Sequence, residues 1–164
     1  MIKLVASDLD GTLLHNYQQT VPKEIYDTIK ALHEKGIIFT AASGRQYANI
    51  RRLFAPLGFD IPYIAENGSM CVYKEEILAT GLTPSKTIRH ILDALMEYRK
   101  IYHTGHCILS VKDTYYSDST DERFIDYMEN DMHNIVTYVP DLYAIKEPII
   151  KAAICDFRSE ERRV

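Results

Sequence analysis

The chain has 164 residues, of which 46% are hydrophobic and 26% are charged, which is typical of a folded globular protein and not of a disordered one. Its 19 Lys and Arg residues against 23 Asp and Glu residues give a formal charge of -4, which argues against a general basic surface for nucleic acid or for an anionic membrane. The first apolar run is too short for a signal peptide or a membrane span. Together with three widely spaced cysteines, this favours a cytoplasmic protein with three buried thiols, Cys71, Cys107 and Cys155.

Strands and helices alternate in the first half of the chain. Short apolar runs at residues 2–7, 37–42 and 63–65 predict strands. A helix is predicted over 22–36, because a proline marks its start and a glycine marks its end. A second helix is predicted over 47–57. This alternation predicts an α/β fold in which right-handed crossovers connect the parallel strands of a doubly wound sheet.

The pattern changes after Gly81. A helix opens at Pro84, and the residues that follow predict antiparallel pairing in an α+β arrangement. We therefore predict two domains, over residues 1–82 and 83–164. The further elements expected in the second domain are a hairpin of 107–111 with 115–116, a helix from about Thr120, and strands at 135–139 and 149–157.

Two carboxylates, Asp8 and Asp10, directly follow the first predicted strand. Side chains two residues apart in extended backbone point to the same side, and parallel sheets bind ligands at the carboxyl ends of their strands. The pair predicts a phosphoryl-transfer site with Asp8 as nucleophile, Asp10 as the neighbouring acid and base, and Mg²⁺ screening Asp8 from the phosphate. The alternative is an acidic loop that only ends the strand, because Asp-Gly is common in turns.

Ser43, Gly44 and Arg45 follow the second predicted strand. The Ser43 hydroxyl can donate to a phosphoryl oxygen, and Gly44 leaves its backbone N–H open to the same anion at the start of a helix. Ser43 could instead act only as a helix N-cap. Arg45 could face a substrate or could be a solvated helix arginine.

Three segments in this order, DLDGTLL at 8–14, ASGR at 42–45 and AENG at 65–68, resemble the Cof-type branch of the haloacid dehalogenase (HAD) superfamily. Members of this branch are magnesium-dependent phosphatases of sugar phosphates and other small phosphorylated metabolites. The resemblance covers the whole chain, because the family inserts an α+β cap domain after the third strand of a Rossmann-like core. It implies an incomplete parallel-sheet core over 1–82 and an incomplete cap over 83–164.

The resemblance also implies roles for single residues. Asp8 would form an aspartyl-phosphate and ligate Mg²⁺, while Asp10 would protonate the leaving group, activate water and ligate the metal through its backbone carbonyl. The Leu9 N–H, Ser43 and Gly44 would hold the phosphate. Asn67 matches a family position near the active-site entrance, without an assigned role.

The family's return from the cap has no match in this chain. That return carries a phosphate-binding lysine and a Gly-Asp-x-x-Asn-Asp segment that completes the metal site, and neither Lys146 nor Lys151 fits the lysine's place. We therefore expect a chain truncated after its cap, with weakened metal binding and poor or absent phosphatase activity. Residues 159–162 predict the first turn of a further helix, and the first strand would become an open sheet edge that could self-associate or bind a partner.

Two other functions remain as alternatives. A noncatalytic remnant would bind a partner through the open sheet edge. A receiver-type phosphoacceptor would need an aspartate after the third strand, where the chain has Glu66 and Asn67. Separately, His103, His106 and Cys107 could form part of a zinc or nickel site, but with no second cluster to complete four ligands we expect exposed or hydrogen-bonded histidines.

Overall fold

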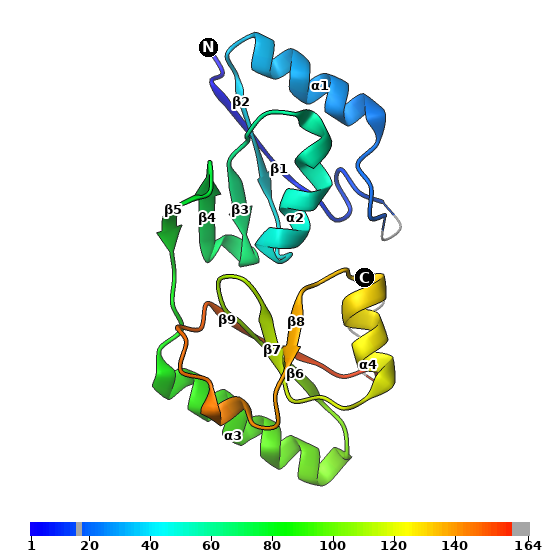
Figure 1. The fold of residues 1–164 in the computed structure, drawn as a ribbon, viewed down its shortest axis with the longest axis vertical. Coiled ribbons are helices and arrows are strands. Elements are labelled where there is room, and N and C mark those ends of the chain that lie inside the picture. The colour runs from blue at the N-terminus through cyan, green and yellow to red at the C-terminus, as the bar shows by residue number, and fades with distance from the viewer. Residues whose placement is uncertain (16–17, 159–164) are drawn as a thin grey trace. The chain divides into compact units, whose positions relative to one another are not determined.

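The computed structural model describes residues 1–15 and 18–158 and divides the chain into two compact units, Met1–Gly81 and Leu82–Val164 (Figure 1). The helical turn predicted at residues 159–162 lies outside the described residues. Among the described helices, none combines the length and the apolar character needed to cross a membrane. Each unit is built around its own sheet.

The first unit contains a five-stranded sheet in which strand order follows chain order. The first three strands are parallel, and α1 (Lys23–Glu34) and α2 (Tyr47–Phe54) form the crossovers between them, which confirms the predicted alternation. Pro56 lies in a 3₁₀ turn that follows α2. The strands are β1 (Leu4–Asp8), β2 (Ile38–Ala42), β3 (Tyr63–Ala65), β4 (Met70–Tyr73) and β5 (Glu76–Thr80).

The hairpin of β4 and β5 was not predicted, and it makes the sheet mixed. Only a short 3₁₀ turn, Glu66–Gly68, separates β3 from β4, and a parallel connection needs a far longer crossover, so β4 pairs antiparallel to β3. The turn to β5 places Lys74 and Glu75 at φ angles of 50° and 65°. Lys and Glu are not the Asn and Gly residues that usually mark such a turn, which explains the missed hairpin.

The sheet is not doubly wound in the part of the chain that the structure describes. Successive right-handed crossovers that move in one direction along a sheet place α1 and α2 on the same face. On the other face, the register partners Leu4 and Ile38 are 54% and 50% exposed. Within the described residues β1 pairs with β2 alone, so its outer side is the open edge expected from the sequence.

The second unit contains a four-stranded sheet with the order β8-β7-β6-β9. Strand β6 pairs antiparallel with β7 and β9, as predicted, but β7 and β8 are parallel. The reason is the connection between them, which carries the chain back through α4 (Glu122–Asp126) and a π-helical turn, Tyr127–Asp131. The strands are β6 (His106–Ser110), β7 (Tyr115–Ser117), β8 (Val136–Tyr138) and β9 (Lys151–Cys155).

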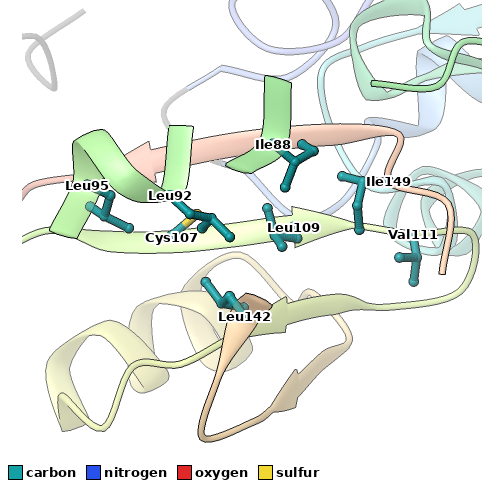
Figure 2. Packing of buried hydrophobic residues seen from close by; sticks show 8 residues of the cluster. All are labelled: Ile88, Leu92, Leu95, Cys107, Leu109, Val111, Leu142 and Ile149. Carbon is teal, nitrogen blue, oxygen red and sulfur yellow. The ribbon is translucent and has the colours of Figure 1, made fainter. Parts of the chain in front are cut away.

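Helix α3 (Ser85–Tyr102) covers this sheet through one apolar face. Figure 2 shows Ile88, Leu92 and Leu95 of α3 above Cys107 and Leu109 of β6. Spacings of three and four residues along the helix bring the α3 side chains onto one face, as the sequence predicted.

Candidate active site

Three parallel strands deliver the predicted site residues to one edge of the first sheet. Asp8, the last residue of β1, pairs in register with Ala42 of β2, which in turn pairs with Ile64 of β3. The Ser43 N–H donates to the Ile64 carbonyl at 2.8 Å, and the Asn67 N–H donates to the Ser43 carbonyl at 3.2 Å. The loops that carry Asp8, Ser43 and Asn67 are therefore neighbours at the carboxyl ends of the strands.

The loop after β1 is a tight turn anchored by Leu9. The Leu9 side chain is fully buried, and its carbonyl accepts hydrogen bonds from the three N–H groups of residues 12–14 at 2.8 to 3.2 Å. Gly11 adopts a φ of 80°, in the left-handed region that favours glycine. Asp8 and Asp10, on either side of Leu9, remain exposed at the surface.

Arg45 is not a solvated helix arginine, because its side chain is only 5% exposed and is bound to Asp10. Its Nε lies 2.9 Å from Asp10 Oδ2 and its Nη2 lies 2.6 Å from Asp10 Oδ1. A two-point contact of this kind fixes both the position and the plane of a carboxylate. Proximity of Arg45 to a substrate stays a prediction.

Gln19 and Asn49 complete the environment of the Arg45 guanidinium, and sequence reasoning missed both. The Arg45 Nη1 donates to Gln19 Oε1 at 3.0 Å and to Asn49 Oδ1 at 3.2 Å. Asn49 lies four residues after Arg45, a helical spacing that could have revealed the contact. Gln19 comes from the segment between β1 and α1 and carries no such signal.

Gly44 and Asn67 are in such close contact that a side chain at position 44 would require the Asn67 side chain to move. A Cβ atom built on Gly44 would collide with Asn67 Oδ1. Asn67 itself adopts φ 58° and ψ 32°, a left-handed conformation that asparagine tolerates better than most residues. The contact with Asn67 in the segment 65–68 thus explains why the segment 42–45 has a glycine at position 44.

The Ser43 side chain is buried beside this contact. Its Oγ accepts a hydrogen bond from the Arg45 N–H at 3.2 Å within the turn that precedes α2, whereas the N-cap residue of α2 is Gln46. Because the hydroxyl acts there as an acceptor, its own hydrogen can still be donated to another group. The interpretation of Ser43 as a helix N-cap is therefore wrong, while donation from its hydroxyl to a phosphoryl oxygen stays a prediction.

The oxygen donors near Asp8 fit a magnesium ion held largely by water. The Asp8 carboxylate and the Asp10 backbone carbonyl are hard oxygen ligands, whereas both Asp10 carboxylate oxygens already accept from Arg45. In the described part of the chain, His, Cys, Asp and Glu side chains form no group of three or more that could hold a metal ion. Mg²⁺ commonly keeps several waters and takes only one or two protein carboxylates, so the two donors suit part of its shell.

His106 and Cys107 lie in the sheet of the second unit. The His106 ring stacks on Phe124 at 4.6 Å, and its Nδ1 lies 2.9 Å from Ser119 Oγ. Cys107 is fully buried, and burial raises the pKa of its thiol to about 12, while Cys71 and Cys155 are partly exposed, in contrast to the three buried thiols expected. His106 is thus hydrogen-bonded, and Cys107 is held in the neutral form that binds metals poorly.

Comparison with known proteins agrees with this fold. A family model of haloacid dehalogenase-like hydrolases matches residues 5–163. The chain therefore belongs to the haloacid dehalogenase-like hydrolase family.

Individual relatives and solved structures show how much of the chain the similarity covers. Phosphoglycolate phosphatase 1 of Saccharolobus solfataricus is 39% identical over 77 residues, which are 46% of this chain and 34% of that protein. A crystal structure from Eubacterium rectale superposes with a TM-score of 0.77 at 25% identity, over 93% of this chain and 57% of the other. A HAD subclass IIB sugar phosphatase shares the fold, with a TM-score of 0.71 at 22% identity, over 92% and 57% of the two chains. The chain thus spans about a third of the archaeal relative and just over half of each solved structure.

Proposed function

We propose that this chain carries the nucleophile half of a magnesium-dependent phosphatase of small phosphorylated metabolites, with sugar phosphates as the substrate class. The observation that carries the proposal is the shared edge of β1, β2 and β3, where Asp8, Ser43 and Asn67 are held together by strand register and backbone hydrogen bonds. The relatives named above add support, because they include a phosphoglycolate phosphatase and a sugar phosphatase.

In the proposed first step, a carboxylate oxygen of Asp8 attacks phosphorus and the bond from phosphorus to the leaving oxygen breaks. Asp10 donates a proton to that leaving oxygen. The N–H groups of Leu9 and Gly44 and the Ser43 hydroxyl would orient the phosphoryl oxygens by hydrogen bonds. When bound, Mg²⁺ would offset the charge repulsion between Asp8 and the phosphate.

In the proposed second step, water attacks phosphorus and the bond to the Asp8 oxygen breaks, which releases phosphate and restores the carboxylate. Asp10 takes the proton from that water. The two-point contact with Arg45 keeps the Asp10 carboxylate in one orientation through both steps. Each Asp10 oxygen retains a second lone pair, so the contact leaves a place for the transferred proton.

The activity of this chain by itself is expected to be weak or absent, because the described residues provide only part of a magnesium shell. The test measures hydrolysis of p-nitrophenyl phosphate with Mg²⁺ by the 164-residue chain, by Asp8→Asn and by Asp60→Asn. Asp60 is a matched control, since it is an exposed carboxylate that precedes β3. Rapid hydrolysis that only Asp8→Asn abolishes would overturn the expected weakness, and hydrolysis that survives Asp8→Asn would overturn the role of Asp8.

A binding measurement tests the site without relying on turnover. Amide signals of the ¹⁵N-labelled chain are followed during titration with inorganic phosphate and Mg²⁺. The proposal expects selective shifts at Leu9, Ser43 and Gly44, because these groups would hold the anion. Shifts that avoid all three residues would contradict the proposed phosphate site.

The open edge of the first sheet supports self-association as a second candidate function. The exposed apolar side chains of Leu4 on β1 and Ile38 on β2 lie on one face of the sheet next to this edge, and an unpaired edge strand is a template for pairing with another chain. Light scattering across a concentration series is expected to show dimers that Leu4→Lys dissociates. Ile101→Lys, which changes an even more exposed apolar residue on α3, is the control. A monomer at every concentration would contradict this candidate.

A further inference from the structure

The second unit contains a cavity of about 470 Å³ that the proposed phosphatase site does not use. It lies between the start of α3, strand β6 and the segment 142–149. Its volume is within the range of small-molecule pockets, roughly 300–1,000 Å³. All of its lining residues belong to the second unit, so the cavity exists independently of how the two units are arranged.

The floor of the cavity is apolar and forms part of the core of the second unit. Ile88 and Leu92 come from α3 and Leu109 from β6, while Leu142 and Ile149 come from the segment that follows β8. Figure 2 shows these five side chains among the residues of the core cluster. Each of the five is less than a tenth exposed, so only small parts of these side chains reach the cavity, and the surface that they present there is apolar.

The rim of the cavity carries excess positive charge. Arg89 and Lys146 both line it, and neither forms an ion pair with another described residue. The rim also holds one carboxylate, Glu147, which accepts a hydrogen bond from the Tyr116 hydroxyl at 2.8 Å and one from the Lys146 N–H at 3.2 Å. These contacts lower the pKa of Glu147. The lining therefore has two cations against one anion that is already hydrogen-bonded within the protein, and the nearby carboxylate of Asp93, outside the lining, accepts a hydrogen bond from the Tyr143 hydroxyl at 2.7 Å.

We propose that this cavity binds a small amphipathic anion, with its apolar body on the floor and a single carboxylate or phosphate headgroup between Arg89 and Lys146. An apolar floor alone would not distinguish charged from neutral ligands, whereas the two cations favour a ligand with a negative end. A hydrocarbon body of about six to ten carbons suits a cavity of this size. The assignment does not depend on the chemistry of Asp8.

The test follows amide signals of the full ¹⁵N-labelled chain during titration with octanoate, octyl phosphate, octanol or inorganic phosphate. The two amphipathic anions are expected to shift signals of the lining residues, and the comparison between them distinguishes the two headgroups. Octanol lacks the charge and inorganic phosphate lacks the apolar body, so both are expected to bind at least several-fold more weakly. Equal binding of octanol and octanoate would overturn the role of the two cations.

Matched variants locate the binding site. Arg89→Gln and Lys146→Gln are each expected to weaken octanoate binding about two- to fivefold, as for an exposed charge contact. Lys86→Gln on the same helix lies outside the cavity lining and is expected to have no effect. Ser85→Trp at the rim should block access to the cavity. Thr87→Trp on the same helix should not, because Thr87 does not line the cavity. The proposal would be overturned if Ser85→Trp left octanoate binding unchanged. It would also be overturned if octanoate shifted no signal of a lining residue.

Discussion

The guanidinium of Arg45 holds both carboxylate oxygens of Asp10, with Nε 2.9 Å from Oδ2 and Nη2 2.6 Å from Oδ1. The two residues belong to different sequence segments and lie 35 positions apart. The contact therefore joins the loop after β1 to the loop after β2 through side chains, in addition to the strand pairing. Because Arg45 is buried and Asp10 is half exposed, the arginine acts as the fixed partner and the aspartate as the residue that it orients.

Arg45→Ala is expected to lower the free energy of unfolding of the first unit by about 1–3 kcal/mol, as for loss of hydrogen bonds to a charged group. The substitution also leaves the amide oxygens of Gln19 and Asn49 without the donor they now share. Urea denaturation monitored by circular dichroism measures the change. Arg52→Ala, at an exposed arginine of α2, is the control and should change stability by less than about 0.5 kcal/mol. Equal effects of the two substitutions would show that the Asp10 contact adds no stability.

Gly44→Ala is expected to destabilise the first unit because the new methyl group would collide with Asn67 Oδ1. Asn67→Gly removes that oxygen and still permits the left-handed backbone at this position. The effect of Gly44→Ala should therefore be smaller in the Asn67→Gly background, with a coupling energy of at least about 0.5 kcal/mol in a double-mutant cycle. Additive effects of the two substitutions would contradict direct contact between the residues.

Sequence reasoning predicted where the candidate site residues lie in the fold better than it predicted their side-chain contacts. Asp8 was predictable because a motif and an apolar strand coincide there, and parallel topology then places Ser43 at the same edge. The partner of Arg45 was not predictable, because the contact with Asp10 depends on the path of a loop and not on a periodic pattern. For the same reason Gln19 was missed, while Asn49 at helical spacing was within reach.

The missed features of the fold have a similar cause. The hairpin of β4 and β5 depends on left-handed conformations at Lys74 and Glu75, residue types that do not indicate a turn. The parallel pairing of β7 with β8 depends on where α4 returns the chain. In contrast, the spacing of apolar residues along α3 predicted which face of this helix is buried, and the structure confirms it.

Tyr98→Phe is expected to raise the pKa of Asp156 toward its ordinary value of 3.8. The Tyr98 hydroxyl donates to Asp156 Oδ2 at 2.5 Å and, together with the Arg158 N–H, lowers the pKa of that carboxyl to about 2. Carboxyl ¹³C signals measured during an acid titration report the value directly. Tyr102→Phe is the matched control, because its ring lies 4.6 Å from the Tyr98 ring in a tilted arrangement and no described contact joins it to Asp156.

The same pKa shift predicts how stability depends on pH. The pKa of Asp156 is lower in the folded chain than in the unfolded chain, so its contribution is fully present above about pH 4 and is lost as the pH falls through about 2. The second unit should therefore lose stability across that interval, and Asp156→Asn should remove this part of the loss. An unchanged acid response in Asp156→Asn would show that the hydrogen bond from Tyr98 contributes no stability.

Alkylation should distinguish Cys107 from the other two cysteines. Burial raises the pKa of the Cys107 thiol to about 12, whereas Cys71 and Cys155 are partly exposed. Only the thiolate reacts, and an ordinary cysteine has a pKa of about 8.5. At pH 8, Cys107 should therefore react on the order of a thousandfold more slowly than a cysteine with that ordinary pKa. Iodoacetamide labelling followed by peptide mass spectrometry measures the three rates. Labelling in urea is the control, because all three rates should then converge, and rapid labelling of Cys107 in the folded chain would contradict its place at the interface between α3 and β6.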